Sequence, residues 1–141
     1  MDEANNAGFS LLEVVVVLAI MGLILSIVGQ RAVQNIESAY FVNTSESVLA
    51  DITFWKIDAN VNQQPRIIEM TVSAPQNWTE QEQLNIRTLD LPEGWISEGE
   101  PIRISSTGMC FGGQVTLEDQ NGRRIAYELT PPHCERRRIV S

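Results

Sequence analysis

The chain has 141 residues, a formal net charge of −8 and 43% hydrophobic residues. We expect a chain of this length to hold one membrane anchor and one small domain. The acidity is uneven, since residues 37–119 hold 13 acidic and four basic residues, whereas residues 120–141 hold five arginines and two glutamates. The middle of the chain should therefore repel nucleic acid and anionic lipid, while the C-terminus need not.

A long apolar segment follows a short polar start. Residues 1–8 read MDEANNAG, and the twenty residues from Phe9 to Val28 carry a single charge, the carboxylate of Glu13. A helix of that length is about 30 Å long, which matches the hydrocarbon core of a bilayer. We therefore predict a membrane-spanning N-terminal anchor over residues 9–28. An unpaired carboxylate costs about 2.5 kcal/mol or more at the centre of such a helix, so Glu13 needs a partner.

Other interpretations of this segment stay open. Ser10 and Glu13 have the spacing of a capping box, in which the serine caps the helix and the glutamate reaches back, but this leaves Gly8 and Phe9 without a role. A secretory signal peptide calls for a basic start and a small-x-small cleavage site, which residues 27–31 do not supply. A plain signal anchor fits the apolar run but has no use for a buried acid.

The segment Gly8-Phe9-Ser10-Leu11-Leu12-Glu13 and its apolar run resemble the N-terminus of class III prepilins. These are the type IV pilins, their minor pilins and the pseudopilins of type II secretion. The resemblance implies a leader over residues 1–8, cleavage of the Gly8–Phe9 bond by a prepilin peptidase, and methylation of the new Phe9 amine. It also implies that Glu13 pairs with that amine in a neighbouring subunit during assembly. Unlike the leaders of the family, this one has no basic side chain.

Helical periodicity continues beyond the anchor, because no proline occurs before Pro65 and apolar side chains recur near one face. We predict one helix from about Ser10 to about Asn60. Its residues 29–62 should form an amphipathic continuation that packs on a head made of residues 63–141. The predicted packing face, with Val33 and Leu49 beside it, consists of Ile36, Tyr40, Val48, Ile52, Trp55 and Ala59.

From Arg66 the pattern changes to strands. Runs at 66–73, 84–91 and 101–105 are separated by turns, and runs at 113–118 and 123–129 flank Asn121-Gly122, a strong hairpin signal. We predict four or five short antiparallel strands against a long helix, which is an α+β fold. The layout resembles the pilin fold. Its closing hairpin and short tail most resemble the H-type minor pseudopilins and the FimT-like minor pilins.

The two cysteines, Cys110 and Cys134, fit an exported domain in an oxidising compartment. A disulfide between them would close a loop of about 25 residues and stabilise the head by about 3 kcal/mol. Two unpaired buried thiols are the alternative. The spacing is similar to the C-terminal disulfide loop of type IV pilins. Because Cys110, His133 and Cys134 lack C-x-x-C spacing, we expect no metal site and no cofactor.

The basic C-terminus suggests one ligand. Its arginines would converge if the disulfide draws residues 134–138 toward the hairpin, and such clusters attract phosphate backbones. Some FimT-like minor pilins bind DNA for uptake, so the resemblance implies DNA as one partner. A solvated terminus, or ion pairs with the acidic middle of the chain, is the alternative. The residues concerned are Arg123, Arg124, Arg136, Arg137 and Arg138.

Catalysis is not expected. His133 is the only histidine and has no evident carboxylate or serine partner, and no Walker loop, HExxH or GxSxG motif occurs. Among the tryptophans, we place Trp55 in the core, and Trp78 and Trp95 either at an interface or over the sheet.

Together these patterns predict a minor pilin or pseudopilin of a type II secretion pseudopilus or a type IV pilus. It would be held in the bacterial inner membrane with its head in the periplasm, and other pilins would be its partners. A DNA-binding minor pilin for DNA uptake and a monomeric membrane-anchored periplasmic domain are the alternatives.

Overall fold

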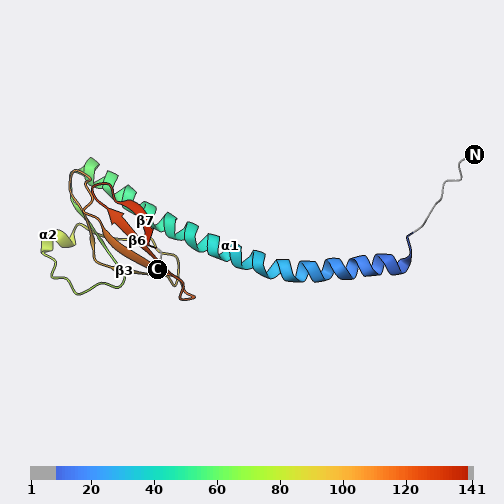
Figure 1. The fold of residues 1–141 in the computed structure, drawn as a ribbon. Coiled ribbons are helices and arrows are strands. Elements are labelled where there is room, and N and C mark those ends of the chain that lie inside the picture. Colours follow the sequence, from blue (N-terminus) through green and yellow to red (C-terminus); the bar gives the residue numbers. More distant parts are fainter. Residues whose placement is uncertain (1–8, 140–141) are drawn as a thin grey trace, which may run out of the picture. The chain divides into compact units, whose positions relative to one another are not determined.

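The computed structural model describes residues 9–139, which form two helices and seven strands (Figure 1). This α+β, pilin-like arrangement confirms the predicted fold class. The chain divides into two compact units, one up to Tyr40 and the other from Phe41 onward. The elements are α1 (Leu11–Asn62), β1 (Arg66–Glu69), α2 (Glu80–Gln83), β2 (Ile86–Thr88), β3 (Ile96–Gly99), β4 (Ile102–Ile104), β5 (Gly113–Glu118), β6 (Arg124–Thr130) and β7 (Glu135–Ile139).

Helix α1 ends close to the predicted position. The amide of Gln64 donates to the carbonyl of Ala59 at 3.1 Å, and Gln63 has a positive φ of 51°. A residue in this left-handed region commonly closes a helix. Pro65 then disfavours helical backbone in the residue before it, so the chain leaves the helix and enters β1.

The strands form two sheets, with the orders β2-β1-β4 and β3-β5-β6-β7. The prediction of a purely antiparallel head was wrong in one respect, because β1 and β2 run parallel and pair Ile67 with Ile86. Parallel strands need a connection that returns the chain to the same end. Residues 70–85, which include α2, provide it, so the polar stretch predicted as an interruption contains a short helix.

The core lies between the sheets and the part of α1 that belongs to the second unit. Strands β5 and β6 alternate, so that Val115 and Leu117 of β5 and Tyr127 and Leu129 of β6 face inward and are buried. The four-stranded sheet therefore has one core face and one solvent face. Helix α1 contributes Phe41, Ser45, Val48, Leu49, Ile52 and Ala59 to this core.

The predicted packing face of α1 was partly right. Val48, Leu49, Ile52 and Ala59 are buried as expected, whereas Ile36 and Tyr40 are exposed. Phe41 is buried instead and packs on the ring of Trp95, with 5.2 Å between the ring centroids. Adjacent residues of a helix point about 100° apart. The apolar spacing at the start of the amphipathic segment placed Tyr40 on the packing face, whereas its neighbour Phe41 is the buried residue.

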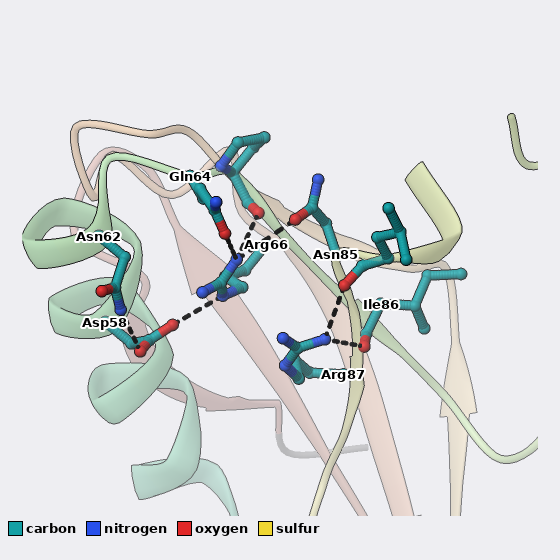
Figure 2. Close-up of polar contacts among 9 residues, drawn as sticks. Asp58, Asn62, Gln64, Arg66, Asn85, Ile86 and Arg87 are labelled. Carbon is teal, nitrogen blue, oxygen red and sulfur yellow. Dashed lines mark hydrogen bonds and ion pairs between the residues drawn. The ribbon is translucent and has the colours of Figure 1, made fainter. Parts of the chain in front are cut away.

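A buried arginine joins the end of α1 to β1 (Figure 2). The Nε of Arg66 donates to the carboxylate of Asp58 at 2.7 Å, and its Nη1 donates to the side chains of Gln64 and Asn85 at 3.2 and 3.3 Å. Asp58 also accepts from Asn62, one turn later on the helix. These bonds satisfy a guanidinium that is only 5% exposed, which a buried charge requires. They fix the helix end against β1 and the segment before β2.

Candidate functional site

The start of α1 places Phe9 and Glu13 on the same side of the helix. The first helical bond runs from the amide of Val14 to the carbonyl of Ser10 at 3.2 Å, and Glu13 lies in the first turn. Phe9, Glu13, Val14, Val17 and Leu18 line one shallow apolar hollow of about 300 Å³. The positive end of the helix dipole favours a carboxylate at this position.

Glu13 has no hydrogen-bond or ion-pair partner among residues 9–139. The capping box considered for Ser10 and Glu13 is not formed there. A capping box does occur at α2, where Thr79 caps the helix and the carboxylate of Glu82 accepts from the amide of Thr79. The Glu13 carboxylate is therefore held in an apolar segment with nothing of its own chain in the described range to neutralise it.

The rest of the first unit is an exposed apolar helix. Its large side chains are between 46% and 83% exposed from Leu11 to Val28, and none of the most apolar stretch is buried. Within the described residues, α1 is the one helix long and apolar enough to cross a membrane. Apolar surface of this extent is not stable in water, so the segment needs lipid or other protein around it. The predicted leader, including Gly8, lies outside the described residues.

Cys110 and Cys134 form a disulfide that joins the loop before β5 to the start of β7. The same two segments are also linked by the amide of Cys110, which donates to the carbonyl of Pro132 at 2.8 Å. The ammonium of Lys56 on α1 donates to the carbonyl of His133. The disulfide loop is thereby attached to the helix as well as to the sheet.

A groove of about 580 Å³ lies between the end of α1 and this loop. Ile57, Val61 and Met109 are exposed along it, and His133 also lines it. Phe54 is also exposed, on the same side of α1 as Ile57 and Val61. Sequence reasoning missed this second apolar side of α1, although the three- and four-residue spacing of positions 54, 57 and 61 would have indicated it.

The five C-terminal arginines lie on two faces of the four-stranded sheet. Cross-strand neighbours share a face, so Arg137 lies with Glu128 on the solvent face, where the two form an ion pair. Arg136 and Arg138 lie on the opposite face, beside Leu129 and Tyr127 of β6. Arg136 reaches α1, where its Nη1 donates to the carbonyl of Glu46 at 2.8 Å.

The two arginines at the hairpin also have partners. Arg124 pairs with Glu98 and with Glu118, which lies opposite it in the register. Arg123 pairs with Asp119 at 2.8 Å and lies over the ring of Phe41. The structure does not bring the five arginines together into one patch, and DNA binding by them stays a prediction.

The tryptophans all pack against the head. Trp55 and Trp95 are half-buried at the edge of the core. Trp78 donates from Nε1 to Glu69 at 3.4 Å, and the guanidinium of Arg103 lies 5.3 Å from its ring centre. Trp78 therefore packs over the three-stranded sheet.

Across residues 9–139, no group of three or more His, Cys, Asp or Glu side chains is arranged to hold a metal ion. His133 is exposed and contributes its carbonyl, and not its ring, to the bond with Lys56.

Comparison with known proteins gives one match. Residues 4–29, less than a fifth of the chain, match the family model of the prokaryotic N-terminal methylation motif. This range contains Gly8, Phe9 and Glu13. No curated protein and no solved structure matches the chain.

The match supports a class III prepilin, that is, a type IV pilin-like protein. Its motif implies processing by a prepilin peptidase and assembly with other pilins, and proteins of this kind are structural rather than catalytic. The motif and the apolar helix are consistent with membrane anchoring.

Proposed function

We propose that this protein is a minor pilin or pseudopilin, a structural subunit of a type II secretion pseudopilus or a type IV pilus. Before assembly, residues 9–28 hold it in the inner membrane and its head lies in the periplasm. The observation that carries the proposal is Glu13, a carboxylate with no partner among residues 9–139, in the exposed apolar helix that follows the Gly8–Phe9 bond.

Cleavage of the Gly8–Phe9 bond supplies the missing partner. The new amine of Phe9 is a cation one helical turn from Glu13. When two subunits shift along the filament axis, the amine of one reaches the carboxylate of the other. Such a pair neutralises two desolvated charges at once, whereas loss of either group leaves a buried ion. The energetic penalty of a lone Glu13 therefore favours assembly.

The apolar outer side of α1 in the head also supports the proposal that the protein is a subunit of an assembly. Phe54, Ile57 and Val61 are 59%, 60% and 74% exposed, and they lie opposite the face of α1 that packs on the sheets. A helix with apolar residues on two opposite sides is suited to lie between two partners. The head covers one side, and a neighbouring subunit would cover the other.

The finer assignment to the H-type pseudopilins or FimT-like pilins rests on the closing hairpin. Strands β5 and β6 pair from Gly113 with Leu129 to Glu118 with Arg124, and Asn121-Gly122 lies in the connecting turn. Gly122 has a φ of +78°, which favours glycine. In this proposal the protein acts by packing and not by turnover.

Substitution of Glu13 tests the proposal. The variant Glu13→Val, expressed with a prepilin peptidase and the cognate pilins, should insert into the membrane and be cleaved, yet fail to enter sheared filaments. Insertion is measured by membrane fractionation, and cleavage and methylation of Phe9 by mass spectrometry of the intact protein. The variant Glu37→Val removes a charge from the same helix outside the apolar segment and should enter filaments normally. Normal incorporation of Glu13→Val, or a natural protein that retains residues 1–8, would contradict the proposal.

A further inference from the structure

Strand β7 forms an open edge of the four-stranded sheet. In the described residues it pairs with β6 alone, and all five of its residues are exposed. The opposite edge, β3, is covered by its own chain, because the amide of Val72 donates to the carbonyl of Ser97 at 2.9 Å and Gly99 donates back at 3.3 Å. The fold therefore covers one edge of this sheet and leaves the other open.

An open edge offers main-chain hydrogen bonds. In an antiparallel pair, every second residue directs its amide and carbonyl away from the partner strand. The outward groups of β7 have no main-chain partner within residues 9–139. Such groups form a template onto which an extended segment can add as a further strand.

The side chains of β7 favour an added segment that is negatively charged. Arg136, Arg137 and Arg138 are consecutive, so each face of the edge carries at least one guanidinium. An added strand would lie about 4.8 Å from β7, whereas Glu128 lies on β6, on the other side of β7, and Glu46 lies on α1. The charged groups nearest to the added strand are therefore those of β7 itself, three arginines and one acid, Glu135, so the edge is basic on balance.

These arginines keep donors free in spite of their ion pairs. Arg137 donates to Glu128 through Nε and Nη2, and its side chain is 75% exposed. Its Nη1 makes no hydrogen bond in the described residues. Arg136 uses Nη1 for Glu46, which leaves Nη2. A guanidinium has five donor hydrogens, so both side chains can donate to a second carboxylate.

A second copy of β7 does not fit this edge. Two such strands would place arginine opposite arginine, and like charges in directly opposed positions are destabilising. Strand β2, at the edge of the other sheet, carries Arg87 and no acid, so it is not complementary to β7 either. The complementary occupant is a different chain that carries carboxylates.

We propose that the edge of β7 is a docking site for an extended acidic segment of another protein, which adds to the sheet as its fifth strand. The proposal goes beyond a filament role, because assembly through the N-terminal helix makes no use of this edge. It also differs from DNA binding, since phosphate contacts would not need the outward amides and carbonyls of β7.

The proposal has two parts, main-chain pairing with β7 and charge attraction to its arginines. A peptide whose backbone N–H groups are blocked tests the pairing without changing the charge. The full-length protein in detergent micelles is titrated with a fluorescent seven-residue peptide in which glutamate alternates with threonine and valine. The same peptide with N-methyl groups along one edge keeps its charge but loses the N–H donors of that edge, about half of its main-chain donors. The unmodified peptide should bind and the two N-methylated versions, one for each edge, should differ, with at least one losing measurable binding. Fluorescence anisotropy reports the affinity.

A matched pair of variants tests the charge. The variant Arg137→Glu places a glutamate opposite a glutamate of the peptide. It should weaken peptide binding by about tenfold, because attraction is replaced by repulsion. Arg103→Glu is the control, since Arg103 is also an exposed strand arginine paired with a glutamate, and it should bind the peptide as the natural protein does. Equal binding of all three peptides, no binding at millimolar peptide, or binding of duplex DNA without the peptide would each overturn the proposal.

Discussion

Asp119 is buried in the turn between β5 and β6, and it receives three hydrogen bonds. The amides of Asn121 and Arg123 donate to its Oδ1, each at 2.9 Å, and the Nε of Arg123 donates to its Oδ2 at 2.8 Å. Burial by itself raises the pKa of Asp119, but the amide and side chain of Arg123 and the amide of Asn121 outweigh it and lower the pKa. The turn therefore depends on an ionised carboxylate.

A depressed folded-state pKa gives a defined pH dependence. The carboxylate of Asp119 stabilises the fold above the pKa of an unfolded aspartate, about 3.9, and this contribution is lost as the pH falls through the folded value. In Asp119→Asn the charge is absent at every pH. The variant should be less stable near pH 7, and the difference in the free energy of unfolding should shrink between pH 5 and the acid range. Urea denaturation across that range measures it.

Glu98→Gln is the control for this experiment, because Glu98 is an exposed carboxylate on the solvent face of the sheet. Its difference from the natural protein should vary less with pH. A constant difference between Asp119→Asn and the natural protein down to acid pH would contradict the account of Asp119.

Tyr127 is also buried, but its pKa is raised, whereas that of Asp119 is lowered. Its hydroxyl is buried without a hydrogen-bond partner in the described residues. Burial and then the neighbouring carboxylate of Glu46 raise its pKa to about 12. The distances and angles show no hydrogen bond between the two side chains, so the influence of Glu46 is that of its charge. Tyr127 is thus neutral throughout the physiological range.

At the scale of elements, β7 depends on the disulfide before its first residue, on its pairing with β6 and on one contact with α1. Its first residue follows Cys134, which is joined to Cys110 and is itself buried. Along its length it pairs with β6, and Arg136 connects it to α1. None of its five side chains is buried, so the hydrophobic effect does little to hold the strand in place. The disulfide and the main-chain bonds have that role.

Removal of the disulfide should therefore loosen β7 before the rest of the sheet. The double variant Cys110→Ser/Cys134→Ser frees a loop with a sequence separation of 24 residues and should lower the free energy of unfolding by about 3 kcal/mol. Hydrogen exchange should accelerate more in β7 than in β5, which lies inside the sheet. Denaturation and exchange measured by mass spectrometry check both effects.

Reductant provides the control for the disulfide. It should weaken the natural protein by a similar amount and leave the double variant unchanged. Equal acceleration of exchange in β5 and β7 would mean that the disulfide stabilises the head as a whole and not the edge strand.

At the scale of the whole molecule, apolar surface remains exposed in both units. In the first unit it covers the helix from Leu11 to Val28, and in the second it follows the outer side of α1. The interior of the head is nevertheless well filled, with Leu49, Ile68, Ile102 and Leu117 almost completely buried. The exposed apolar residues are therefore available for contacts with lipid or with other subunits.

Substitution on the two sides of α1 should separate stability from assembly. Phe54→Ser/Ile57→Ser changes two exposed side chains and should alter the free energy of unfolding by less than about 1 kcal/mol. The same variant should enter filaments poorly. Leu49→Ser is buried on the opposite side and should cost about 3 kcal/mol or more in stability.

The measurements are the unfolding of the detergent-solubilised protein and the amount of each variant in sheared filaments. A stable Phe54→Ser/Ile57→Ser variant that assembles normally would show that the outer side of α1 is not part of the subunit contact.

Much of the fold was predictable because its signals are local. Twenty nearly uncharged residues predict the anchor helix, the lack of proline extends the helix to about Asn60, and Asn121-Gly122 marks the hairpin turn. Each of these signals depends on neighbours within a few residues, where propensity and turn chemistry act. The methylation motif is local in the same way.

Long-range contacts decided the rest. The parallel pairing of β1 with β2 and the place of β7 beside β6 join segments that no short window of sequence relates. The basic tail was not predicted as a strand, because its three consecutive arginines do not alternate between apolar and polar residues.

The amino-acid sequence by itself therefore determined the apolar anchor, the lone carboxylate of Glu13 and the hairpin, since backbone preference and hydrophobic spacing act within single elements. Only the tertiary structure decided that Arg136 and Arg137 lie on opposite faces and that β7 is left as an open edge. The physical reason is that strand order and side-chain partners arise from packing and hydrogen bonds between distant segments.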